Sequence, residues 1–187
     1  MIDDLYPRFS EKELARRRQS IVELMGSAGV SHLVAYGAER VGSAVPWLTE
    51  WPVTTEAVLL FTPEETPRLL VQHYNHLPNA RRIASDCEVE WGGPSTLARL
   101  EELLRARVTP GRRVGVLGPL RHRSHLRLEG SVGELVELDA EYQRLRLVKS
   151  PEEIERLEVA ARLSDQAVGA IVEQVEVGMD ERRLAAL

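Results

Sequence analysis

Residues 150 to 175 carry the pattern of one long amphipathic helix. Ser150 is a preferred N-cap, Pro151 suits the first helical position, and Glu153 lies where it completes a capping box with Ser150. Apolar or small side chains then recur every three or four residues and form one stripe, at Ile154, Leu157, Ala161, Ser164, Val168, Ile171 and Val175. A stripe of this length needs a partner surface.

The chain after this helix is too short to supply that surface. Gly178 is expected to stop the helix, and a further helix starting at Asp180 reaches only Leu187. We therefore expect a first domain over residues 1–148, followed over residues 149–187 by the linker and first helices of a truncated second domain.

The first domain is predicted to alternate helices and strands. Ser10 can cap an opening helix that Gly29 stops, and two apolar runs flanking residues 62–67 indicate a hairpin. Residues 37–52 are expected to be irregular, and the residues between 117 and 134 give no clear pattern. Further helices are expected at 78–84 and 94–107, and strands at 32–36, 57–61, 68–72, 87–91, 114–117 and 134–138. This alternation favours an α/β domain, a mixed β-sheet with helices on both faces.

Composition narrows the function classes. The 187 residues are 43% hydrophobic, and no apolar run approaches the length needed to span a bilayer. The chain holds 22 Arg and 2 Lys, but its net charge is −5, so the arginine clusters at 16–18, 81–82 and 121–127 are interpreted as solvated faces. We expect neither nucleic-acid nor membrane binding. The lone Cys87 and the absence of a signal-peptide pattern indicate a cytoplasmic protein.

Two histidine pairs are candidates for chemistry. His73 and His76, like His122 and His125, stand three residues apart, but neither pair has a carboxylate or cysteine at ligand spacing. No metal ligand is therefore assigned in this chain. His73 and His76 are either partly exposed structural histidines or substrate-side groups at the edge of a cleft. Cys87 has no neighbouring base that would activate it as a nucleophile, and no nucleotide-binding glycine motif is present.

Two tryptophans stand close together in the segment expected to be irregular. Trp47 and Trp51 flank Glu50, among loop-forming residues. Paired indoles of this kind form either a small core cluster under the loop or an aromatic wall for a ligand or partner, and both interpretations stay open. The candidates for a substrate cleft or an interface are therefore Trp47, Glu50, Trp51, His73 and His76.

The junction near residue 148 resembles that of a known family. The run 146–154, followed by Ala160-Ala161 and by residues 177–181, is similar to the domain junction of the creatinase, prolidase and Xaa-Pro aminopeptidase superfamily. Residues 47–49, Trp-Leu-Thr, stand where the family often has Tyr-Leu-Thr-Gly, so Trp47 replaces the Tyr and Glu50 replaces the Gly. Residues 111–116 resemble a late strand of the N-terminal domain.

This resemblance implies a division of labour between two domains. An N-terminal α/β domain precedes a pita-bread catalytic domain, in which Asp, Asp, His, Glu and Glu hold two divalent ions (manganese, cobalt or zinc) that activate a bridging water. Those ligands are expected beyond Leu187, so this chain alone is expected to be inactive. It is expected to shape a cleft for a short proline-containing peptide and to support a homo-oligomer, most simply a dimer. By the same resemblance, the region of residues 47–51 lies toward the catalytic cleft or toward a neighbouring subunit.

Two other functions are compatible with the same resemblance. A non-catalytic relative of the family could serve as a peptide- or protein-binding module, and a creatinase-type relative could hydrolyse a small non-peptide substrate. A full ligand set beyond Leu187 would support the enzyme, whereas the loss of several ligands would support the binding module.

Overall fold

The computed structural model describes residues 8–109 and 111–186. The chain divides into two compact units, one that ends at Leu147 and one that begins at Val148.

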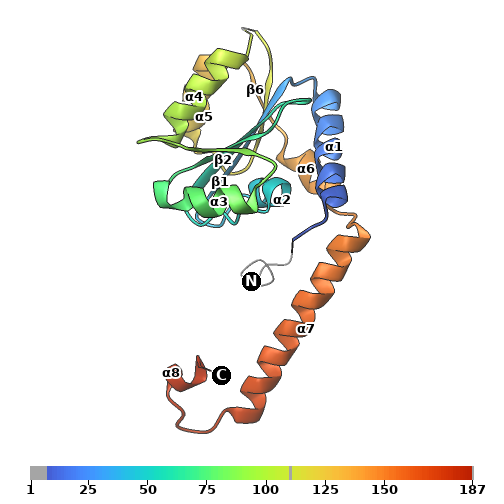
Figure 1. The fold of residues 1–187 in the computed structure, drawn as a ribbon, viewed down its shortest axis with the longest axis vertical. Helices are drawn as coiled ribbons and strands as arrows, with labels where there is room; N and C mark the ends of the chain where they lie inside the picture. Colours follow the sequence, from blue (N-terminus) through green and yellow to red (C-terminus); the bar gives the residue numbers. More distant parts are fainter. Residues whose placement is uncertain (1–7, 110, 187) are drawn as a thin grey trace. The chain divides into compact units, whose positions relative to one another are not determined.

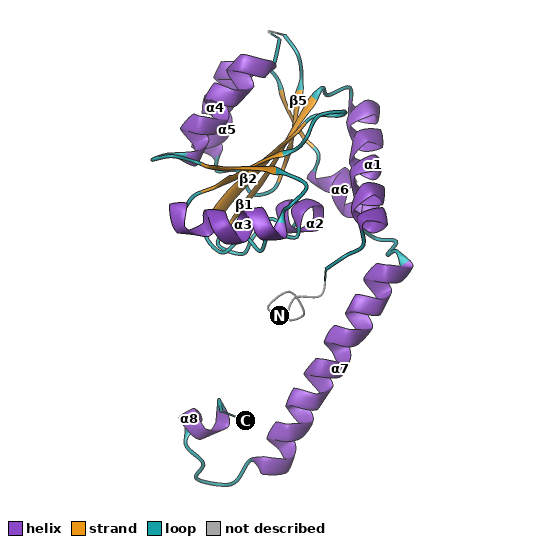
Figure 2. Cartoon of the chain, in the orientation of Figure 1, coloured by secondary structure: helices purple, strands orange, loops and turns teal. Residues whose placement is uncertain are grey.

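The first unit is built on a six-stranded mixed sheet (Figures 1 and 2). Its order is β4-β3-β2-β1-β5-β6; β1–β2 and β2–β3 are antiparallel, and the other neighbouring pairs are parallel. The strands are β1 His32–Ala38, β2 Glu56–Phe61, β3 Arg68–Val71, β4 Glu88–Trp91, β5 Val114–Leu117 and β6 Leu135–Glu137. The predicted hairpin, each predicted strand and the α/β class with a mixed sheet are confirmed.

Helices cover both faces of this sheet. The helices of the first unit are α1 Glu11–Ala28, α2 Ala44–Thr49, α3 Leu77–Ile83, α4 Thr96–Arg107, α5 His122–Val132 and α6 Asp139–Leu145, with a 3-10 turn, η2, at Tyr74–His76. Side chains of β1 alternate between two cores: Leu33 and Ala35 pack with α1, α2, α3 and α6, and Val34 and Tyr36 pack with α4 and α5. Burial on both faces explains why β1 is a nearly continuous apolar run.

The opening helix forms as predicted, but one of its arginines is buried. Ser10 Oγ accepts the Glu13 N–H at 3.2 Å, and Gly29 ends α1 in the left-handed conformation. Arg17, which the sequence placed on a solvated face, is only 2% exposed. Its Nε donates to Glu13 Oε1 at 2.8 Å, and its Nη1 donates to the Trp47 carbonyl oxygen at 3.0 Å. These partners compensate for the loss of water around the buried charge.

Three short helices were not predicted. α2 lies within residues 37–52, which were expected to be irregular, so Trp47 is helical. α5 occupies the segment without a clear pattern, and α6 follows β6 directly. α2 and α6 have only six and seven residues, too few to establish a helical period, and none of the three has a side-chain N-cap hydrogen bond.

The second unit contains α7, Pro151–Gln174, and α8, Glu181–Leu184. Both bonds of the predicted capping box are present: Ser150 Oγ accepts from Glu153 N at 3.1 Å, and Glu153 Oε2 accepts from Ser150 N at 2.9 Å. α7 ends before Gly178, the predicted stop, and none of its residues is buried. Across residues 8–109 and 111–186, no helix has the length and apolar character required to cross a membrane.

Candidate functional site

The sheet has a topological switch point between β1 and β5. These neighbouring strands are parallel, but the chain leaves β1 toward α2 on one face of the sheet and leaves β5 toward α5 on the opposite face. Connections that diverge in this way leave a crevice outside the carboxyl ends of the two strands, where ligands of open α/β sheets commonly bind.

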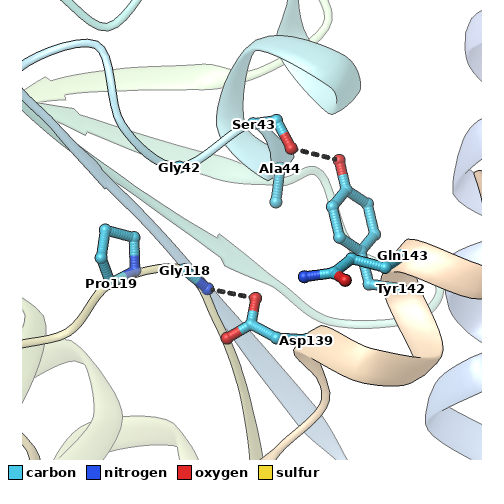
Figure 3. A pocket seen from close by; sticks show the side chains of 8 residues that line it. All are labelled: Gly42, Ser43, Ala44, Gly118, Pro119, Asp139, Tyr142 and Gln143. Atoms are coloured by element: carbon cyan, nitrogen blue, oxygen red, sulfur yellow. Dashed lines mark hydrogen bonds between the residues drawn. The ribbon is translucent and has the colours of Figure 1, made fainter.

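A pocket of about 360 Å³ lies at this place (Figure 3). Three segments line it: the loop that leads into α2, the loop after β5, and the first turns of α6. The lining residues are Gly42, Ser43, Ala44, Gly118, Pro119, Asp139, Tyr142 and Gln143. The volume lies within the usual range of about 300–1,000 Å³ for small-molecule sites.

Two glycines allow the loops to turn this tightly. Gly42 and Gly118 have φ of 92° and 98°, a region that side chains rarely adopt. A Cβ on Gly42 would lie 2.5 Å from the Tyr36 carbonyl oxygen, and a Cβ on Gly118 would overlap the same oxygen. Both loops therefore fold back over the end of β1.

The polar groups of the pocket are held by hydrogen bonds. Asp139 Oδ1 accepts the Gly118 N–H at 2.9 Å and so ties α6 to the loop after β5 (Figure 3). Ser43 Oγ and the Tyr142 hydroxyl lie 3.4 Å apart. Arg146 Nη1 donates to Ser43 Oγ at 2.6 Å and to the Tyr142 hydroxyl at 3.1 Å. Burial raises the pKa of the Tyr142 phenol, although the hydrogen bond with Ser43 and the Arg146 charge oppose that change, so the phenol keeps its proton at neutral pH.

Comparison with known proteins identifies the fold. No protein-family model matches the chain. A 75-residue segment, 39% of the chain, is 33% identical to the Xaa-Pro dipeptidase of Pyrococcus furiosus and covers 22% of that protein. The X-Pro aminopeptidase of Thermotoga maritima matches 90% of the chain with a TM-score of 0.74 and 18% identity. The N-terminal, creatinase/prolidase-like domain of a metallopeptidase from Corynebacterium diphtheriae matches 67% of this chain and 96% of its own length, with a TM-score of 0.53 and 15% identity.

The chain has the creatinase/prolidase N-terminal-domain fold. The resemblance predicted from the junction at residues 146–154 is thereby confirmed at the level of the fold. The chain covers 46% of the Thermotoga maritima structure, so it spans about half the length of such full-length relatives.

In this creatinase/prolidase-type domain, both predicted tryptophans lie in the core. Trp47 and Trp51 are each 6% exposed. The Trp47 ring meets the Tyr142 ring edge-on, with centroids 5.7 Å apart, so Trp47 supports one wall of the pocket from behind. The core interpretation therefore describes both indoles, and a role of Trp47 or Trp51 at a cleft or interface stays a prediction.

The two predicted histidines lie beside Trp51. The ring centroids of Trp51 and His76 are 5.8 Å apart, and those of His73 and His76 are 5.2 Å apart. His73 is exposed and His76 is half-buried. The structure thus brings Trp51, His73 and His76 into one aromatic cluster, while Trp47 packs toward Tyr142.

The structure explains why Glu50 can stand where the family often has glycine. It ends α2 with φ of 60°, a conformation that favours glycine, which the family often has there. Its carboxylate accepts from the Phe9 N–H at 2.7 Å and from Arg8 Nε at 3.2 Å. These bonds fasten the segment before α1 and offset the backbone strain. A role of Glu50 at a cleft or interface stays a prediction.

The remaining candidate groups do not form a reactive site. His122 and His125 both lie on α5, and among residues 8–109 and 111–186 no three His, Cys, Asp or Glu side chains are grouped to hold a metal ion. The described residues therefore do not fit the two-metal centre that the resemblance implies. Burial and the neighbouring Asp86 carboxylate raise the pKa of the Cys87 thiol to about 12, so its thiolate is scarce at neutral pH.

Sequence reasoning did not identify the pocket. Asp139, Tyr142 and Gln143 belong to α6, which was not predicted. One signal was available. Gly118 follows β5 directly, Asp139 comes two residues after β6, and these two strands are parallel. The carboxyl ends of parallel strands meet at one edge of a sheet, so polar residues there are candidates for a site.

Proposed function

We propose that this chain is the non-catalytic N-terminal domain of a cytoplasmic Xaa-Pro dipeptidase- or aminopeptidase-like metallohydrolase. The observation that supports this most strongly is the match of 90% of the chain to the Thermotoga maritima X-Pro aminopeptidase, with both units aligned in part. The local 33% identity to the Pyrococcus furiosus Xaa-Pro dipeptidase supports the same relation at the level of sequence.

In this proposal the domain shapes the substrate cleft and supports a homodimer. It limits access to short proline-containing peptides, while two divalent ions and their ligands belong to a separate catalytic domain. Within the aromatic cluster of Trp51, His73 and His76, the exposed His73 and the half-buried His76 support such a role, because aromatic side chains that are accessible at a surface are common contacts for peptides and for partner subunits.

The 187-residue chain by itself is expected neither to retain catalytic metal nor to release proline from Xaa-Pro dipeptides. The test is to incubate it with manganese, dialyse it, determine metal by elemental analysis and assay proline release. The full-length Pyrococcus furiosus dipeptidase, treated in parallel, is the control. Retention of two metal ions per chain, or turnover above a protein-free blank, would show that the domain is catalytic and refute the proposal.

A further inference from the structure

The pocket at the switch point is flanked by opposite charges along one face of α6. Asp139, Tyr142, Gln143 and Arg146 are spaced i, i+3, i+4 and i+7, so they lie on one side of the helix and its C-terminal cap. Asp139 and Arg146 are separated by about 10 Å of rise along the helix axis. Figure 3 shows the Gln143 side chain between the Asp139 carboxylate and the Tyr142 ring.

The acidic end has acceptor capacity for a cationic group. Asp139 uses Oδ1 to accept the Gly118 N–H. A carboxylate offers about four acceptor sites on its two oxygens, so one backbone bond leaves sites for further donors. An ammonium group is a compact cation with three donors and is suited to this position.

The opposite end of the pocket offers a polarised hydroxyl donor. Ser43 Oγ and the Tyr142 hydroxyl each accept a hydrogen bond from the Arg146 guanidinium, at 2.6 and 3.1 Å. A hydroxyl that accepts from a cation can still donate its own proton, and the nearby positive charge strengthens that donation. Ser43 Oγ and the Tyr142 hydroxyl also share a hydrogen bond at 3.4 Å, so one of their two protons remains for a ligand, and this donor beside a guanidinium is suited to a carboxylate.

We propose that this pocket binds a small zwitterion, a free amino acid or a dipeptide, with its ammonium on Asp139 and its carboxylate toward Ser43, Tyr142 and Arg146. The volume of about 360 Å³ admits molecules of this size. The proposal stands on the geometry of the first unit alone and does not depend on the peptidase assignment.

The test is a titration of the isotope-labelled full chain, followed by NMR, with L-proline, L-alanine and L-alanyl-L-proline, which distinguish an amino-acid site from a dipeptide site. N-acetyl-alanine lacks the ammonium group and alaninamide lacks the carboxylate. We expect the zwitterions to shift resonances of residues 42–44, 118–119 and 139–143, and each analogue to bind about tenfold more weakly or worse, because each loses a charge-assisted contact. Equal binding of the analogues and alanine, or no shift with any zwitterion, would overturn the proposal.

Charge-removing variants test which end holds which group. Asp139→Asn is expected to weaken alanine binding about tenfold and to leave the N-acetyl-alanine affinity unchanged, whereas Arg146→Gln leaves the alaninamide affinity unchanged. Glu129→Gln and Arg123→Gln remove the same charges from exposed positions of α5 and serve as matched controls. If Asp139→Asn unfolds, as judged by circular dichroism, the analogue series on the unmodified chain still decides. Equal losses for alanine and for both analogues in either folded variant would contradict the assignment.

Discussion

Replacing Arg17 with alanine is expected to lower the free energy of unfolding by about 3 kcal/mol, because removing one partner of a buried ion pair leaves the other groups without compensation. The lost contacts are the bonds to Glu13 and to the Trp47 carbonyl oxygen, and the stacking of the guanidinium 3.7 Å above the Phe9 ring centroid. Arg16, which also pairs with Glu13, keeps the loss at the lower end of the range for such pairs. Urea denaturation, followed by circular dichroism, measures this change in the free energy of unfolding.

Arg16→Ala is the matched control. Arg16 makes a comparable ion pair with Glu13 at 2.7 Å, but its side chain is 40% exposed. Solvent-exposed pairs contribute about 1 kcal/mol or less, so this variant is expected to lose no more than that. If the two variants were equally stable, the burial of Arg17 and its bonds to Glu13 and to the Trp47 carbonyl oxygen would have no energetic consequence, and this explanation would be wrong.

Gly118→Ala is expected to destabilise the first unit by about 3 kcal/mol and to disrupt the pocket, because the new Cβ would overlap a carbonyl oxygen in a backbone conformation that already costs about 1–3 kcal/mol for other residues. The overlapped atom is the Tyr36 carbonyl oxygen in the neighbouring strand β1, which cannot move without breaking the sheet. Denaturation reports the loss of stability. Resonances of residues 42–44 and 139–143 report the change in the pocket.

Gly130→Ala is the opposite case. Gly130 lies inside α5, and a Cβ there would meet nothing within 4 Å. Alanine in a helix interior is favoured over glycine by about 0.5–1 kcal/mol, so this variant is expected to gain stability. A similar effect of the two substitutions, in either direction, would mean that the left-handed turn at Gly118 does not constrain the fold.

The sequence predicted the elements whose local signals agree with their tertiary environment. Ser150 and Glu153 form both bonds of their capping box, and Ser10 and Gly29 bound α1, because caps act within four residues and depend little on the rest of the fold. Each strand of the sheet was also predicted, and for the central strands the signal was the short apolar run that burial on both faces produces, as at residues 57–61.

The elements and residues that escaped prediction are those decided by tertiary contacts. Arg17 is chemically identical to its neighbours Arg16 and Arg18, and only the presence of Glu13 and the Trp47 carbonyl at one place distinguishes it. The pocket combines residues from three segments, and its first and last lining residues, Gly42 and Gln143, are 101 positions apart along the chain. Its position depends on the connections after β1 and β5, which leave toward opposite faces of the sheet, and the sequence alone did not establish these directions.

The mass and activity of the native protein show whether this chain is the N-terminal part of an Xaa-Pro metallopeptidase. Antibodies raised against the first unit can capture the native protein from the cells that produce it. Because this chain covers 46% of a full-length relative, we expect a captured protein of about twice the mass of this chain. We expect this protein to release proline from Xaa-Pro dipeptides and immunodepletion to remove the activity. A captured protein that does not hydrolyse these peptides, whatever its mass, would contradict the assignment and favour a binding module.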